Sequence, residues 1–300
     1  MLGTGFLRHI YRNTVHRGVI SWAELLLSLA SETGCDLSDD IKCASQGLVG
    51  YWESLCFQVA HQQRIQASMA ENLLRNKIQE FLGIECEEFF LQCEPGACEQ
   101  IWQRRDRFLS LGFRNILNYN FDRTLSFTKD STPPRIEPSN TNSLVGRKYK
   151  SAKLHGMPPG NVWHPHGDLG AKGTILLGIR QYGLQISELE KSRVKFKSEE
   201  SEDKHYDEDE WYKVAVNAPL VLLGLGLSPD EWDIWWFLTN RTRNHSKLEP
   251  RQEPRLYRLV AINDADSNAV DWLNIGQHRI IDLCADSWDE AWERFYECFS

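Results

Sequence analysis

The strongest constraint on the fold is a change in the spacing of apolar residues at Gly112. Beyond this residue the chain carries short apolar runs that are bounded by turn-forming residues and separated by helical stretches. The runs cover residues 115–119, 174–177, 220–223, 256–262 and 279–283. Runs of this kind are typical of strands that are buried on both faces of a parallel sheet. We therefore expect an α/β fold with a Rossmann-like parallel sheet flanked by helices.

The region before Gly112 has a different pattern. Between residues 36 and 110 the apolar residues recur at helical spacing, as in Leu48, Trp52 and Leu55. We interpret this region as a helical insertion or cap that packs on the sheet, within a single domain that spans residues 1–300. With 300 residues, of which 41% are hydrophobic, the chain is long enough to bury such a core.

Charge and cysteine spacing argue against several function classes. The formal net charge of -8 gives no general attraction to phosphate backbones, so we do not expect nucleic acid as the primary substrate. The eight cysteines include no Cys-x-x-Cys pair, and we expect no metal site. No apolar run reaches the roughly 18 residues of a membrane span, and no signal-peptide pattern is present. We expect a cytoplasmic protein that does not bind membranes.

Two of the segments suited to ligand binding lie at a glycine loop and at a strand end. In Gly3-Thr4-Gly5-Phe6 the bare backbone of the glycines can approach a pyrophosphate, although an ordinary turn is the alternative. The apolar run before Asn120 and Asp122 ends where open α/β sheets bind their ligands. The alternative for these two side chains is that they supply only turn and cap hydrogen bonds.

Two further segments carry histidines and a second glycine loop. The run His164-Pro165-His166-Gly167-Asp168 offers imidazoles, which titrate near neutrality and suit a base in a pocket. His155, which also precedes a glycine, is a competing candidate. In residues 221–231 an apolar run leads into Gly224 and then Ser228, which begins a capping box. This predicts a strand, a loop and a helix whether or not the loop binds a ligand.

Taken in order, these segments resemble the sirtuin-like domain, in particular the divergent branch found in bacterial anti-phage defence proteins. The resemblance rests most specifically on Asn120-Phe121-Asp122 and on the His164 to Asp168 run. It implies that His166 is the base, in preference to His155, and that Asn120 and Asp122 surround the nicotinamide and its ribose. The residues that it implies for contact with the dinucleotide are Gly3, Gly5, Phe6, Gly224 and Ser228.

The resemblance also implies NAD as the substrate. Tyr119 stands where deacylating members usually carry glutamine, and their four-cysteine zinc module is absent. We therefore expect an NAD hydrolase that releases nicotinamide and ADP-ribose, or a cyclic form, and that depletes NAD in anti-phage defence. The alternatives are a non-catalytic module that senses NAD or ADP-ribose and an NAD-dependent protein deacylase.

The expected partners are an activating protein or phage trigger and further copies of the chain in a homo-oligomer. The N-terminus carries a separate expectation, because only Met1 and Leu2 precede the loop at Gly3. A glycine loop of this type follows a central strand of about five or six residues. The sequence therefore predicts that Met1 is not the biological start and that upstream residues supply the rest of this strand.

Overall fold

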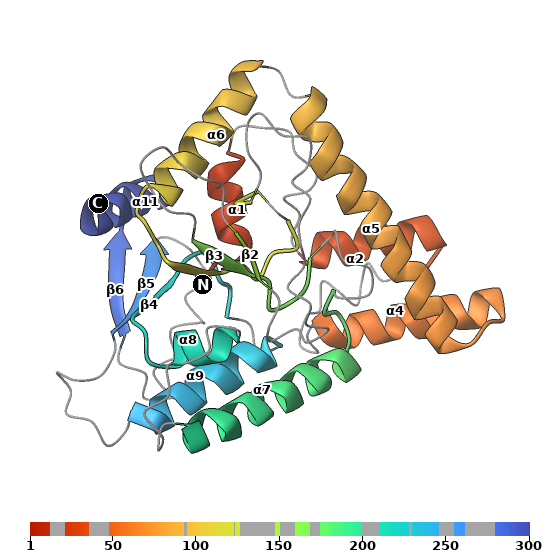
Figure 1. Ribbon diagram of the computed structural model, residues 1–300. Helices are drawn as coiled ribbons and strands as arrows, with labels where there is room; N and C mark the ends of the chain where they lie inside the picture. The colour runs from red at the N-terminus through yellow and green to blue at the C-terminus, as the bar shows by residue number, and fades with distance from the viewer. Residues whose placement is uncertain are drawn as a thin grey trace.

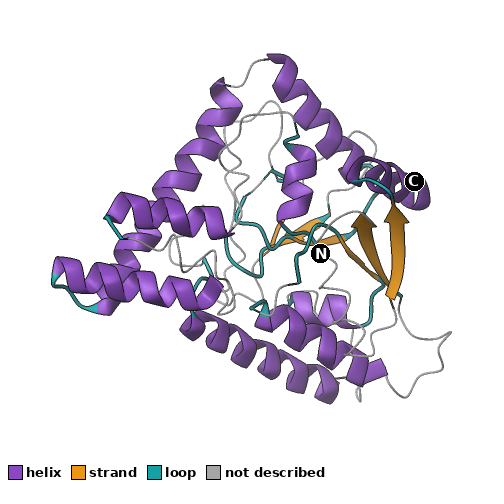
Figure 2. Cartoon of the chain, turned by 180° about the vertical axis from the view of Figure 1, so that it is seen from behind, coloured by secondary structure: helices purple, strands orange, loops and turns teal. Residues whose placement is uncertain are grey.

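The computed structural model describes residues 1–12, 22–35, 48–92, 95–122, 124–126, 148–150, 160–168, 175–199, 210–227, 230–245, 255–261 and 280–300. The fold is mixed α/β and mostly helical, with small parallel sheets. One group of strands lies near the centre of the molecule, and the other lies at its side, next to the C-terminal helix (Figure 2). Among the helices of these ranges, none is both long and apolar enough to cross a membrane.

Six strands are present in the described part of the chain. They are β1 (Asn115–Leu117), β2 (Lys148–Lys150), β3 (Asn161–Trp163), β4 (Leu220–Leu222), β5 (Leu256–Ala261) and β6 (Ile280–Ala285). Strand β1 runs parallel to β3, and β2 pairs antiparallel with β3. Strands β4, β5 and β6 are parallel and lie in that order.

The N-terminal residues connect these two groups of strands. Leu2 forms parallel bridges to Asn118 after β1 and to Leu223 after β4. The Leu2 N–H donates to Leu117 O at 2.8 Å, and the Leu223 N–H donates to Met1 O at 2.9 Å. Figure 1 shows the N-terminus between the two groups. Across the molecule the order is therefore β2, β3, β1, residues 1–2, β4, β5 and β6.

Successive residues on β1, β3 and β4 enter different hydrophobic cores, as the pleat of a strand requires. One core contains Leu117, Trp163 and Leu222, together with residues of α7 (Ile179–Glu199), α8 (Trp211–Val216) and α9 (Trp232–His245). The other contains Ile116, Val162 and Leu223, together with residues of α1 (Thr4–Ile10), α6 (Pro95–Leu109) and α11 (Trp288–Phe299). Figure 1 shows these two sets of helices on opposite sides of the strands. Burial on both faces explains the continuous apolar runs.

A third group of helices forms a cap beside the strands. It consists of α2 (Trp22–Thr33), α4 (Leu48–Gln63) and α5 (Ala67–Gln92), which share their own core. These helices lie together to one side of the strands (Figure 1). Helices α4, α5 and α6 occupy most of the 36–110 region in which the sequence predicted helical structure.

The predicted strand at residues 174–177 is wrong for the residues that the structure describes there. Ile175, Leu176 and Leu177 are buried, yet none of them belongs to a strand. Ile175 and Leu177 pack in the core of the cap, and Leu176 packs with Tyr182. Their apolar character therefore comes from contact with helices and not from a position in a sheet.

Candidate functional site

The four segments that the sequence singled out follow the carboxyl ends of neighbouring parallel strands. Gly3 follows residues 1–2, Asn118 follows β1, His164 follows β3 and Gly224 lies just after β4. Carboxyl ends of parallel strands meet at one edge of a sheet, which is where open α/β folds bind ligands. The four loops therefore lie on a common edge.

The two glycine loops pack directly against each other. The Gly5 N–H donates to Gly224 O at 3.0 Å, and the Gly3 N–H donates to Leu223 O at 2.9 Å. A Cβ on Gly224 would lie 2.3 Å from Phe6 N, and the φ of Gly224 is +63°. Only glycine fits this position without strain. Both N–H groups of the early loop are engaged, and the positions where Gly3 and Gly5 would carry a Cβ are filled by residues 224–225, so neither donor is free for a pyrophosphate.

Phe6 has a packing role in this structure. Its ring is 1% exposed and lies between Phe108, with centroids 4.7 Å apart, and Trp292, with centroids 6.1 Å apart. No open ring face remains for the contact with a dinucleotide that the resemblance implied. Two other predicted residues, Ser228 and His155, lie outside the described part of the chain.

Asn120 ties the end of β1 to the early glycine loop. Its side chain is 7% exposed, and Nδ2 donates to Gly3 O at 3.1 Å and to Asn118 Oδ1 at 3.0 Å. Asp122 Oδ1 accepts a bond from the Thr124 N–H at 2.9 Å, which is a turn contact of the kind expected for aspartate. The other oxygen, Asp122 Oδ2, is buried and has no hydrogen-bond partner among the described residues.

The histidine loop joins the same cluster. His164 Nδ1 lies 3.3 Å from Asn120 O. His166 is 4% exposed, and its Nε2 lies 3.0 Å from Asp233 Oδ2 and 3.2 Å from Asp233 Oδ1. The carboxylate of Asp233 is fully buried in the first turn of α9.

Two tyrosines pack against the His166 ring. The ring centroids lie 4.8 Å apart for Tyr119, with an interplanar angle of 87°, and 5.6 Å apart for Tyr182, with an angle of 78°. Burial, followed by the negative charges of Asp233 and Glu231, raises the pKa of both phenols well above the ordinary range. Both hydroxyls are therefore neutral. The Tyr119 hydroxyl is buried without a hydrogen-bond partner in the described ranges, so a water or a ligand atom would satisfy it.

Asp233 belongs to none of the motifs that predicted the site. The feature that could have indicated Asp233 is its position on α9. Four buried residues follow one another there at intervals of four, namely Asp233, Phe237, Arg241 and His245. Residues four apart lie on one face of a helix, so the carboxylate falls on the face that packs into the core. A buried carboxylate needs a partner, and the partner is His166 from a loop 67 residues away.

The described residues contain no group of three or more His, Cys, Asp or Glu side chains that could hold a metal ion. The four cysteines with described side chains, Cys35, Cys56, Cys284 and Cys298, are free thiols. Comparison of the chain with protein-family models, with curated proteins and with solved structures gave no match.

Proposed function

We propose that this chain is an NAD hydrolase built on a Rossmann-like sheet. Apart from the antiparallel β2, the strands in chain order are residues 1–2, β1, β3, β4, β5 and β6. If these strands are numbered 1 to 6 in chain order, their order across the molecule is 3-2-1-4-5-6. This is the usual strand order of doubly wound dinucleotide-binding sheets. This order supports a nucleotide as the ligand.

The main support for the proposal is that the predicted site residues meet where a doubly wound sheet binds its ligand. In doubly wound sheets the ligand lies where the strand order reverses, which is between the first and fourth strands. In this chain that point lies between residues 1–2 and β4, where Gly5 bonds to Gly224. Asn120 bonds to Gly3 at the same point, and its carbonyl contacts His164 of the histidine loop.

The open hydrogen-bonding atoms suit a ligand rich in donors. Asp122 Oδ2 has no partner among the described residues, and the side-chain hydrogen bonds of Asn120 and His166 there use Asn120 Nδ2 and His166 Nε2, so Asn120 Oδ1 and His166 Nδ1 are left for a ligand. Ribose hydroxyls, a carboxamide NH2 group and water all donate hydrogen bonds. Cleavage of the bond to nicotinamide passes through an oxocarbenium-like state, which a nearby carboxylate such as that of Asp122 stabilises. Nicotinamide leaves as a neutral molecule, so the reaction needs no strong acid.

The proposal is tested by the rate at which purified protein, with its activator if one is required, releases nicotinamide from NAD. His166→Ala should slow the release about 100-fold to 10,000-fold, the usual effect of losing a positioned base. Asn120→Ala should also be impaired, and the exposed His61→Ala should retain the wild-type rate. Full activity in both site variants contradicts the proposal. Loss in His155→Ala with retention in His166→Ala would transfer the role of base to His155.

The same assay separates the alternatives. A module that senses NAD or ADP-ribose binds NAD without releasing nicotinamide, and a protein deacylase requires an acetyl-lysine peptide for turnover. The proposed setting is depletion of NAD in the cytoplasm during anti-phage defence, after activation by a partner protein or a phage trigger, with the chain acting as a homo-oligomer.

A further inference from the structure

We propose that Asp233 is a positioning residue that fixes the proton of His166 on Nε2 and leaves Nδ1 as the nitrogen that takes up a proton during catalysis. The catalytic part of this inference rests on the proposed hydrolase function. The positioning part rests only on the contact between the two side chains.

The contact geometry determines the tautomer. Both carboxylate oxygens of Asp233 face the same ring nitrogen, at 3.0 Å and 3.2 Å. A carboxylate only accepts hydrogen bonds, so a lone pair on Nε2 would face the lone pairs of both oxygens. The neutral imidazole avoids this repulsion by carrying its proton on Nε2, and Nδ1 then holds the lone pair.

The setting of Asp233 indicates a role beyond packing. Its side chain is fully buried, and among the described residues His166 is the only group that hydrogen-bonds to its carboxylate. Its neighbours on the buried face of α9 include Ile234 and Phe237, which belong to the hydrophobic core. An apolar residue at position 233 would avoid burying a charge. A carboxylate at this position can instead accept a hydrogen bond from His166 and so fix the orientation of its ring.

Other contacts hold the backbone at His166 and its ring in place. The Leu176 N–H donates to His166 O at 2.8 Å. The Gln185 side chain on α7 donates to Pro165 O at 3.2 Å, which fixes the preceding residue. Tyr119 and Tyr182 meet the ring nearly at right angles. These contacts keep Nε2 of His166 at Asp233 and fix the direction in which Nδ1 points.

This arrangement gives His166 a defined part in the proposed reaction. As the bond between C1′ of the ribose and the nicotinamide nitrogen breaks, its electron pair stays on the nicotinamide. The oxygen of a water forms the new bond to C1′, and a water proton passes to Nδ1 of His166. The products are nicotinamide, ADP-ribose and one proton, which the imidazole later releases to solvent. The Asp233 carboxylate stabilises the imidazolium that forms in between.

The tautomer is measured directly by 15N NMR of histidine-labelled protein, with the His166 signals assigned by comparison with His166→Gln. We expect the wild-type spectrum to show a proton on Nε2 and none on Nδ1. In Asp233→Asn the carboxamide either accepts from Nε2 or donates to it, so the preference for one tautomer should weaken. A wild-type proton on Nδ1 overturns the proposal, whether or not any variant folds.

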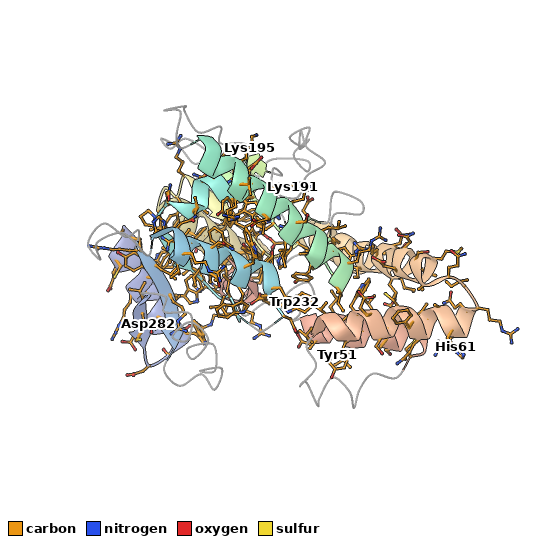
Figure 3. The ribbon with its side chains drawn as sticks, turned by 90° about the horizontal axis from the view of Figure 1, so that it is seen from below. Tyr51, His61, Lys191, Lys195, Trp232 and Asp282 are labelled. Atoms are coloured by element: carbon orange, nitrogen blue, oxygen red, sulfur yellow. The ribbon has the colours of Figure 1, made fainter. Side chains whose placement is uncertain are left out.

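Turnover tests the catalytic part. Asp233→Asn should lower kcat for NAD about 100-fold to 10,000-fold and leave KM within about twofold, because the residue acts on the base. The control is Asp282→Asn, which removes a carboxylate from β6; Figure 3 shows Asp282 well away from Trp232 at the start of α9. It should keep the wild-type kcat. An unchanged kcat in a folded Asp233→Asn overturns the catalytic part. A wild-type protein with the Nε2 tautomer but without NAD cleavage would refute the proposed function alone.

Discussion

His9 is a partly buried histidine outside the candidate site, and its ring stacks on Trp292 with centroids 4.1 Å apart. Its Nε2 lies 3.2 Å from the Tyr296 hydroxyl. Burial, together with the positive charge of Arg104, lowers the pKa of His9 from 6.5 to about 3. The neutral ring is therefore part of the contact between α1 and α11, and its role is in stability.

This lowered pKa predicts a dependence of stability on pH. The unfolded state takes up the His9 proton near pH 6.5 and the folded state only near pH 3, so the free energy of unfolding falls as the pH drops through this window. Between pH 7 and pH 5 the contribution of His9 to this loss should reach about 2 kcal/mol. Denaturant unfolding of His9→Phe should show a smaller loss over this range, whereas replacement of the exposed His61 (Figure 3) should leave the wild-type slope. Equal slopes for His9→Phe and wild type would contradict the prediction.

Gly224 is the residue on which the contact between the glycine loops depends most. Gly224→Ala requires an unfavourable positive φ and a Cβ 2.3 Å from Phe6 N and 2.5 Å from Gly5 C. We expect a loss of about 2 to 4 kcal/mol in the free energy of unfolding, from strain and overpacking together. Gly226→Ala is the matched control in the same loop, because no atom lies within 4 Å of a Cβ at that position. Similar stability of the two variants would show that the loops do not need this close contact.

At the scale of elements, the cap contacts α7 and the segment just before Asp233 on α9. Asp230, three residues before Asp233, accepts a hydrogen bond from the Leu48 N–H at the start of α4, at 2.5 Å. Glu53 on α4 accepts a bond at 2.9 Å from the N–H of Ile179, the first residue of α7. These two hydrogen bonds therefore connect α4 to elements beside the candidate site.

The cap contact predicts the effect of removing Asp230. Asp230→Ala leaves the first N–H of α4 without its side-chain partner, which should cost about 0.5 to 2 kcal/mol, as the loss of a helix cap does. Hydrogen exchange in the first turn of α4 should become faster. Asp230→Asn retains an acceptor oxygen and should stay close to wild type. Exchange that is equally slow in both variants would show that α4 does not depend on this contact.

At the scale of the whole molecule, the sequence predicted elements whose apolar pattern is local. Strands β1, β4, β5 and β6 and helices α4, α5 and α6 lie where the spacing of apolar residues indicated strands and helices. Strands β2 and β3 were not predicted. Strand β2 has lysine at both ends, and the two apolar residues of β3, Val162 and Trp163, directly precede the histidine motif. The run at 174–177 was assigned to a strand because burial against a helical cap produces the same apolar signal as burial in a sheet.

The candidate site was predictable to the extent that its parts are local motifs. The glycine loops, Asn120, Asp122 and His166 come from four separate motifs, and the structure brings the described ones to one edge of the strands. Asp233 could not be assigned from a motif because its partner is 67 residues away in the chain. Likewise, the packing of Phe6 depends on helices α6 and α11, which local spacing does not reveal.

The products that purified protein forms from NAD are the decisive measurement for the proposed hydrolase. The protein, with its activator if one is required, is incubated with NAD, and the mixture is resolved by chromatography. We predict one nicotinamide for each NAD consumed, together with an equal amount of ADP-ribose or its cyclic form. Intact NAD at the end of the incubation, or nicotinamide release that His166→Ala and Asn120→Ala leave unchanged, would contradict the account.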